Sequence, residues 1–284
     1  MSAILSIETA SASCSVALSC DGEIIERNEL GNNIHSAVLL TMVDDLLSGA
    51  GLTAQNLDAV AVGQGPGSFT GLRIGVGVGQ GLAYGADCPM VGVSSLDALA
   101  LQAVSQDRAK SSLFAKGSLF AEGSLFAEGS ISAEGSISAE GSISAEGSIP
   151  AESSFSAEGS IIAMLDARMG EVYWREYESL GQGIRSLGDV QVSAPSDILS
   201  CSPSKAVYVI GNAWQVYSNQ FTGLESSDVF DSGLVYPSAE SLLVLAEKKY
   251  QQGECVSAAE FMPIYVRNDV AKKSTKKLPG RRVV

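Results

Sequence analysis

The sequence contains a single histidine, His35, in a chain of 284 residues. A Ser-His-Asp or Cys-His catalytic site would have to use this residue, and the chain has no G-x-S-x-G nucleophile elbow. A lone histidine at the start of a predicted helix is more typical of a surface or an interface than of catalysis. Because no acidic cluster has ligand spacing either, the sequence predicts no transition-metal site.

Cysteine is also scarce. The five cysteines are odd in number, are scattered and form no C-x-x-C pair; they are Cys14, Cys20, Cys88, Cys201 and Cys255. This pattern argues against a disulfide framework and a zinc knuckle, and it is typical of a reducing compartment. No apolar run reaches the roughly 18–20 residues of a membrane span, and residues 1–8 resemble a strand rather than a signal peptide. We therefore expect a cytoplasmic protein without membrane contact.

Positive charge is scarce except at one end. The formal net charge of −14 repels nucleic acid at long range. Six lysines and arginines nevertheless crowd the last residues, between 272 and 282. This basic tail is either a solvated end of the chain or a phosphate contact.

A glycine-rich stretch, residues 63–81, is the most conspicuous feature that is present. It follows an apolar run that predicts a buried strand over residues 57–62. No lysine follows the loop, so the phosphate-binding pattern G-x-x-x-x-G-K-[ST] is absent. Ser68 stands where a dinucleotide fingerprint has its last glycine. The loop could still offer backbone N–H groups to an anion at a helix start.

Helical spacing from Ser68 onward arranges the glycines in two rows. They are Gly71, Gly75 and Gly79 in one row, and Gly77, Gly81 and Gly85 in the other. Each interior glycine costs a helix about 1 kcal/mol relative to alanine, so we expect another backbone to pack closely on them. Either the helix fills a tight corner of the core, or it also forms a contact surface.

The order of predicted elements in the first half is βββαβαβα. Asp21-Gly22 predicts a tight hairpin turn between two strands, and Asn32 or Asn33 can cap the first helix. That helix carries two adjacent apolar rows, which favour either a core face plus a partner face or a deeply buried helix. The second half repeats the strand-rich opening in a weaker form, with predicted strands at 161–167, 170–177, 184–192 and 207–210 and a helix at 238–251.

Residues 112–159 consist of six-residue units such as SLFAEG and SISAEG. A six-residue period can indicate a β-helix, but serine and glycine in every unit favour a flexible surface insertion. We therefore expect four parts: an N-terminal half (1–110), a hexapeptide insertion (111–160), a C-terminal half (161–270) and a basic tail (271–284).

Asp166 and Arg168 alternate out of a predicted strand end, where α/β folds place ligands. A structural pair that holds a turn is the alternative interpretation, and we favour it.

Motifs along the whole chain outside residues 112–159 resemble the bacterial TsaB (YeaZ) family. They are IETA (7–10), GPGSFTGLRIG (65–75), DARMGEVYW (166–174), PIYVRN (263–268) and KLPG (277–280). The resemblance implies an α/β fold of two actin-like/hexokinase-like halves, the second degenerate. It marks five residues as structural motif positions, namely Gly65, Gly67, Arg73, Asp166 and Arg168. It also leaves open a residual nucleotide loop at Thr9, Ser11 and Ser13.

The resemblance implies a non-catalytic subunit without a cofactor. Such proteins pair through the N-terminal half with the catalytic subunit TsaD, whose two metal-binding histidines they lack, and the ATPase TsaE joins them. The complex forms threonylcarbamoyladenosine at position 37 of tRNAs that read codons beginning with A, so contact with tRNA would be indirect. Without TsaD, we expect a homodimer through the same face. The alternatives are a stand-alone enzyme of this fold (a kinase or a peptidase) and a stand-alone homodimeric binding module.

Combining the apolar rows with the glycine row predicts the partner interface. Its expected residues are Val38, Leu39, Met42, Val43, Leu46, Leu72, Gly75, Val76 and Gly79.

Overall fold

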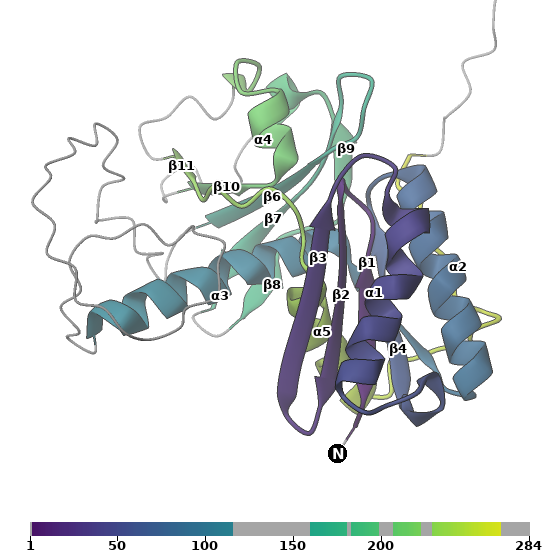
Figure 1. Ribbon diagram of the computed structural model, residues 1–284. Helices are drawn as coiled ribbons and strands as arrows, with labels where there is room; N and C mark the ends of the chain where they lie inside the picture. Colours follow the sequence, from purple (N-terminus) through teal and green to yellow (C-terminus); the bar gives the residue numbers. More distant parts are fainter. Residues whose placement is uncertain (1, 116–159, 181–182, 199–206, 223–228, 268–284) are drawn as a thin grey trace, which may run out of the picture.

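The computed structural model describes residues 2–115, 160–180, 183–198, 207–222 and 229–267. The chain forms two sheets with helices packed on and between them (Figure 1). Most of the hexapeptide tract and the whole basic tail lie outside the described residues.

The first sheet has the strand order β3-β2-β1-β4-β5. Its strands are β1 (Ile4–Glu8), β2 (Ser13–Cys20), β3 (Glu23–Leu30), β4 (Ala59–Gly65) and β5 (Met90–Ser94). The first three strands are antiparallel, and β4 and β5 continue the sheet in parallel beside β1. Asp21 and Gly22 both have positive φ at the β2–β3 turn, which confirms the predicted hairpin.

The second sheet repeats this topology as β8-β7-β6-β10-β11, with β9 paired to β7. Its strands are β6 (Ser160–Asp166), β7 (Val172–Ser179), β8 (Ile184–Ser186), β9 (Gln191–Ser193), β10 (Val207–Ile210) and β11 (Val229–Asp231). As in the first sheet, the leading strand β6 is antiparallel to the next strand and parallel to β10. The shared strand order confirms the expected fold of two related α/β halves.

Helices follow the strands in both halves. They are α1 (His35–Gly49), α2 (Phe69–Ala86), α3 (Ser95–Ala115), α4 (Asn212–Val216) and α5 (Ala239–Gln251), with short 3₁₀ turns η1 (Ala54–Asn56) and η2 (Pro195–Asp197). The first half therefore has the predicted order βββαβαβα. Helix α3 ends at Ala115 rather than near Ser105, so it includes the first residues of the hexapeptide tract.

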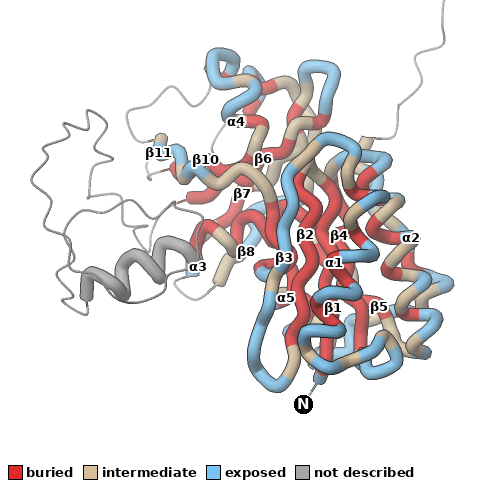
Figure 2. Tube along the Cα trace, in the orientation of Figure 1, coloured by how far each residue is buried: buried red, intermediate tan, exposed pale blue. Residues whose placement is uncertain are grey.

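The first sheet is covered on both faces. Leu5 and Ile7 of β1 face α1 and α2, whereas Ile4 lies in a cluster with α5 on the opposite face. Because alternate side chains point to opposite faces, β1, β2 and β4 are buried along their length (Figure 2). Helix α3 packs on the second sheet, and α4 covers that sheet's other face.

Residues 239–265 of the expected C-terminal range 161–270 pack on the first half, whereas Arg267 pairs with Glu171 of the second half. Ser6 Oγ donates a hydrogen bond to the Ala239 carbonyl at 2.7 Å. Farther on, Val256 bridges to Met90, Phe261 is buried with α1 and α2, and Ile264 N donates to the Gln64 carbonyl at 2.9 Å. The apolar spacing of α5 predicts a buried face but does not specify which sheet buries it.

The predicted asparagine cap of α1 is wrong. The residue before the helix is Ile34, and no side chain caps the helix. Asn33 instead has φ of 61°, a left-handed conformation that asparagine tolerates in turns.

Candidate functional site

The expected interface residues on α1 and α2 lie in the core. Leu39, Met42, Val43, Leu46, Leu72 and Val76 are all at most 5% exposed, Gly75 and Gly79 are also buried, and Val38 is half-buried. This corrects the sequence prediction that these residues form a surface. Both apolar rows of α1 are used within the chain, because the sheet offers α1 and α2 a continuous apolar face from β1, β2 and β4.

The two glycine rows of α2 have different environments. A methyl group at Gly71 would overlap the Thr9 carbonyl oxygen, and one at Gly75 would overlap Thr9 Oγ1. Gly71 and Gly75 are therefore glycine because the β1–β2 loop crosses the helix in direct contact, and a methyl group at Gly79, the third member of this row, would overlap the Val62 side chain of β4. A methyl group at Gly77, Gly81 or Gly85 would meet no described atom within 4 Å, so the described part of the chain gives no steric reason for the second row.

Two of the three residues in the expected nucleotide loop use their hydroxyl groups in hydrogen bonds within the chain. Thr9 Oγ1 donates to the Gly71 carbonyl at 2.9 Å, and Ser13 Oγ donates to Asn28 Oδ1 at 2.7 Å. Both residues are buried. Only Ser11 of the three lines the cleft between the two halves.

Glu8, at the end of β1, is fully buried beside this loop. Its carboxylate accepts hydrogen bonds from Ala10 N at 2.6 Å and from Ser95 Oγ at 2.7 Å. Burial raises the pKa of the Glu8 carboxyl to about 7, against the lowering effect of these hydrogen bonds. A methyl group at Gly63 would overlap this carboxylate. Glu8 does not line the cleft, so it holds the loop rather than a ligand.

The motif positions around the glycine loop shape the cleft wall. Gly65 has φ of 101°, which favours glycine, and a methyl group at Gly67 would overlap the Ala10 carbonyl oxygen. The guanidinium carbon of Arg73 lies 3.8 Å from the centre of the Phe69 ring, and Arg73 Nε donates to Tyr265 Oη at 3.0 Å. Arg73 thereby attaches the C-terminal segment to α2.

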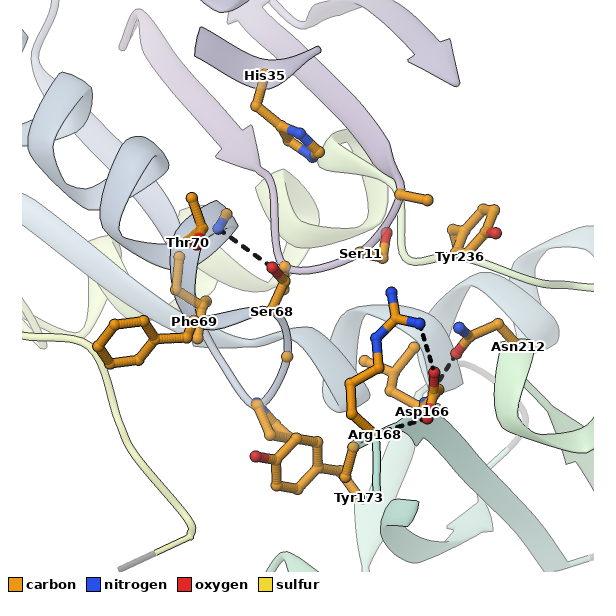
Figure 3. Close-up of a pocket in the computed structure, with 18 of the residues that line it drawn as sticks. Ser11, His35, Ser68, Phe69, Thr70, Asp166, Arg168, Tyr173, Asn212 and Tyr236 are labelled. Atoms are coloured by element: carbon orange, nitrogen blue, oxygen red, sulfur yellow. Dashed lines mark hydrogen bonds and ion pairs between the residues drawn. The ribbon is translucent and has the colours of Figure 1, made fainter. Parts of the chain in front are cut away.

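The cleft has a volume of about 1180 Å³ and is lined by both halves of the chain (Figure 3). The N-terminal ends of α1 and α2 open onto it, together with the end of β6. Its charged lining residues are Arg73, Arg168 and Arg267 against a single carboxylate, Asp166. Two of these arginines are ion-paired, Arg168 with Asp166 and Arg267 with Glu171, which lies outside the lining. The third, Arg73, contacts Phe69 and Tyr265.

Asp166 and Arg168 form the expected pair. Asp166 Oδ1 accepts hydrogen bonds from the Arg168 backbone N–H and from Tyr217 Oη, both at 2.8 Å. Arg168 Nη1 lies 3.3 Å from Asp166 Oδ2. The pair holds a turn, as the structural interpretation predicts. The Arg168 side chain is nevertheless 82% exposed and lines the cleft, so it can also contact a ligand.

His35 is buried, which corrects the sequence interpretation of a surface or interface histidine. The residue lines the cleft and is 5% exposed, and its Nε2 has no hydrogen-bond partner among the residues that the structure describes. The sequence places His35 at a helix start, but a helix start can face either solvent or a second half of the chain.

In the part of the chain that the structure describes, no group of three or more His, Cys, Asp or Glu residues is arranged to hold a metal ion. None of the described helices is both long and apolar enough to span a membrane.

The chain is similar to known proteins in sequence. A family model described as TsaD, tRNA N6-adenosine threonylcarbamoyltransferase, matches residues 29–115. The chain is 32% identical to the tRNA threonylcarbamoyladenosine biosynthesis protein TsaB of Haemophilus influenzae, and the match covers 98% of each chain. It is 33% identical to the protein of the same name from Escherichia coli, covering 98% of this chain and 99% of the relative.

Two solved structures are similar to this chain over most of its length. YeaZ from Pseudomonas aeruginosa superposes with a TM-score of 0.70 and 30% identity, covering 94% of this chain and all of the other. A second structure from that bacterium, described as having similarity to peptidase YEAZ, has the same TM-score at 29% identity. The likeness extends over both sheets and is consistent with an actin-like fold.

Proposed function

The chain belongs to the TsaB (YeaZ) family, and from this membership we propose that it acts in the biosynthesis of threonylcarbamoyladenosine in tRNA. Two relatives named for this process match almost its entire length. The chain would serve there as a non-catalytic subunit that pairs with a TsaD-type transferase, with the ATPase TsaE joining the assembly. The complex, rather than this chain alone, would bind the tRNA.

The exposed glycine row on α2 carries the pairing proposal. The two interior glycines of this row, Gly77 and Gly81, cost an isolated helix about 2 kcal/mol relative to alanine. A methyl group at either of them, or at Gly85 in the last turn, would meet no described atom within 4 Å. Small residues in such a row let a second helix approach closely. On the neighbouring helix, Leu40 is 60% exposed. The partner face therefore consists of the outer rows of α1 and α2, whereas the inner rows form the core.

The TsaD-type match over residues 29–115 supports a symmetric mode of pairing. That range contains both α1 and α2. A transferase with a similar helix pair can present a like face, so the two pairs would pack as a four-helix layer. The same geometry supports a homodimer when the transferase is absent.

The lone histidine supports a non-catalytic role. A general base in a serine or cysteine hydrolase is hydrogen-bonded to its nucleophile, whereas Nε2 of His35 has no partner in the described part of the chain. A serine or cysteine peptidase, the competing function, requires such a pair.

Reconstitution tests the proposal. Threonylcarbamoyl-adenylate, tRNA, the transferase subunit and the ATPase subunit are combined with and without the purified chain, and modified adenosine is quantified. We expect modification to depend on the chain. Modification that is unchanged without it, or peptide hydrolysis by the chain alone, would contradict the proposal.

Gly81→Arg tests the interface itself. A large charged side chain on the outer row should prevent close helix approach, so co-elution with the transferase subunit and tRNA modification should both fall at least tenfold. Gly188→Arg is the matched control, because a side chain there also meets open space but lies in the second half. Circular dichroism should show both variants folded. If Gly81→Arg folds and still co-elutes, the outer row of α2 is not the interface.

A further inference from the structure

Residues 252–267 follow α5 and run past α2 to the cleft (Figure 1, yellow). We call them the C-terminal strap. The last four residues of the strap, 264–267, line the cleft. The strap therefore begins on the first half and ends at the second half, where Arg267 pairs with Glu171.

The strap is fixed to the first half at several points. Gln80 Nε2 of α2 donates a hydrogen bond to the Phe261 carbonyl at 3.0 Å. Gln64 of β4 donates from Nε2 to the Met262 carbonyl at 3.0 Å, and its own carbonyl accepts from Ile264 N at 2.9 Å. The Phe261 side chain is buried among residues of α1 and α2. Hydrogen bonds to the main chain and apolar packing, rather than ion pairs, thus hold this end of the strap.

The attachment to the second half is of a different kind. Arg267 Nη2 is paired with Glu171 Oε2, and Arg267 Nη1 donates to Met169 Sδ at 3.8 Å. These partners belong to the β6–β7 turn, in which Arg168, Met169 and Gly170 all have positive φ. The Glu171 side chain is 44% exposed. An ion pair that water reaches contributes little net free energy and is screened by salt, so this end of the strap can detach while the other stays bound.

Helix α3 joins the two halves in a second place. Its Ala98 lies in the apolar cluster that α5 forms with the first sheet, whereas Leu96 and Leu99 pack on the second sheet. Asp97 Oδ1 accepts a hydrogen bond from Tyr177 Oη of β7 at 2.6 Å. Separating this junction would expose apolar core surface to water, so it persists when the ion pair of the strap is broken.

We propose that the C-terminal strap is a salt-sensitive latch that sets how far the cleft between the two halves opens. With Arg267 on Glu171, the strap holds the halves at the spacing seen in the structure. When the pair separates, the second half turns about α3 and the cleft widens, while the strap stays on α2. Both states keep the two cores intact, so the change requires no unfolding.

Double electron–electron resonance on the full isolated chain measures this opening. Nitroxide-bearing unnatural amino acids replace Ser36 of α1 and Val216 of α4, which line the cleft from different halves, so the five cysteines need not be labelled. Arg267→Gln and Glu171→Gln should each at least double the fraction of molecules with the longer distance between the labels. Raising the salt concentration from about 0.05 M to about 0.5 M should produce this change in the wild type and none in the two variants.

Two further variants separate the ion pair from other effects. The exchanged pair, Arg267→Glu with Glu171→Arg, should restore the wild-type distances and their response to salt. Arg185→Gln is the matched control, because Arg185 is paired with Glu178 within the second half; it should leave the distances unchanged. Circular dichroism should show every variant folded. If an Arg267 variant fails to fold, Glu171→Gln at the exposed carboxylate still decides the question.

Three results would overturn the proposal: unchanged distances in both single variants, a salt response that persists in them, or the same widening in Arg185→Gln. Distances that stay long in the exchanged pair would overturn the assignment of the latch to this ion pair. The test needs neither transferase nor tRNA, so its outcome is independent of the proposed function.

Discussion

Glu8 is a carboxyl group with no solvent contact at the end of a central strand. Its two hydrogen bonds join the β1–β2 loop, through Ala10, to the first residue of α3, Ser95. The loop in turn contacts α2 through Thr9. A single buried side chain thus connects three elements, and its protonation state affects all of them.

The pKa of Glu8 makes the stability of the fold depend on pH. The folded chain keeps this proton up to a pH of about 7, whereas the unfolded chain releases it near 4.5. The stabilisation is therefore fully present below pH 4.5 and is lost as the pH rises through 7. The loss amounts to about 3 kcal/mol in the free energy of unfolding. Glu8→Gln keeps an acceptor for Ala10 and offers a donor to Ser95. The free energy of unfolding of this variant should therefore not decrease by this amount as the pH rises.

Urea denaturation of the wild type and of Glu8→Gln between pH 4 and 8 measures the effect. Glu254→Gln is a suitable control, because Glu254 is an exposed carboxylate paired with Lys249. Parallel pH profiles for the wild type and Glu8→Gln would show that Glu8 titrates equally in the folded and unfolded chains.

At the same scale, the sequence predicts the chemistry of the cleft only in part. The turn formed by Asp166 and Arg168 follows from their position at a strand end. The burial of His35 could not be predicted from the sequence, because it depends on where the second half of the chain packs, and no local sequence pattern encodes that placement. Thr9 and Ser13 carry the hydroxyl groups of a plausible ligand loop, but the close approach of α2 and the pairing with Asn28 use those groups internally.

At the scale of elements, the order of strands and helices in the first half follows from periodicity and turn chemistry. The sequence predicts less completely which face of each helix is buried. Two adjacent apolar rows on α1 are compatible with one core face plus one partner face. The structure uses both rows in the core, because β1, β2 and β4 together form an apolar surface broad enough to cover them. The proposed partner face therefore rests on the second glycine row, Gly77, Gly81 and Gly85, where a methyl group would meet no described atom within 4 Å.

The two glycine rows should respond oppositely to a methyl group. Gly77→Ala should raise the free energy of unfolding of the isolated chain by up to about 1 kcal/mol, because alanine favours the helix and the site is open. Gly75→Ala should lower it, because the methyl group would overlap Thr9 Oγ1. Urea denaturation at low protein concentration, where a homodimer dissociates, makes the comparison. A destabilised Gly77→Ala monomer would mean that the exposed row has a role within the chain.

At the scale of the whole molecule, the two halves exchange their last helices. Helix α3 follows the first sheet but packs on the second. Helix α5 follows the second sheet but packs on the first, beside Ile4 and Ala17. Each sheet therefore completes its core with a helix from the other half, and the cleft between them has walls from both. The sequence resemblance predicts two related halves. It does not predict the exchange of helices, because a division of the chain at residue 161 assigns each helix to the half that precedes it in the sequence.

The hexapeptide tract joins the two halves between α3 and β6, and its removal should leave them intact. The repeats break the composition of the chain, and the described residues on either side of the tract form a hydrophobic core in each half. The closure cost of a flexible loop changes by only about 0.6 kcal/mol for each doubling of its length. Replacing residues 116–159 with a Gly/Ser linker of about twelve residues, which keeps α3 complete, should therefore preserve the free energy of unfolding within about 1 kcal/mol.

The same deletion separates the tract from the proposed function. It removes seven glutamates and one lysine, so the formal net charge changes from −14 to −8. An acidic segment of this kind adds long-range repulsion toward a tRNA-bearing complex, so tRNA modification in the reconstituted system should be equal to that of the full chain or faster at low salt. A control variant that keeps the tract but converts its glutamates to glutamine should show the same salt dependence as the deletion. Loss of folding or of modification in the deletion variant, with the glutamine variant active, would show that the tract itself contributes to the fold or to partner binding.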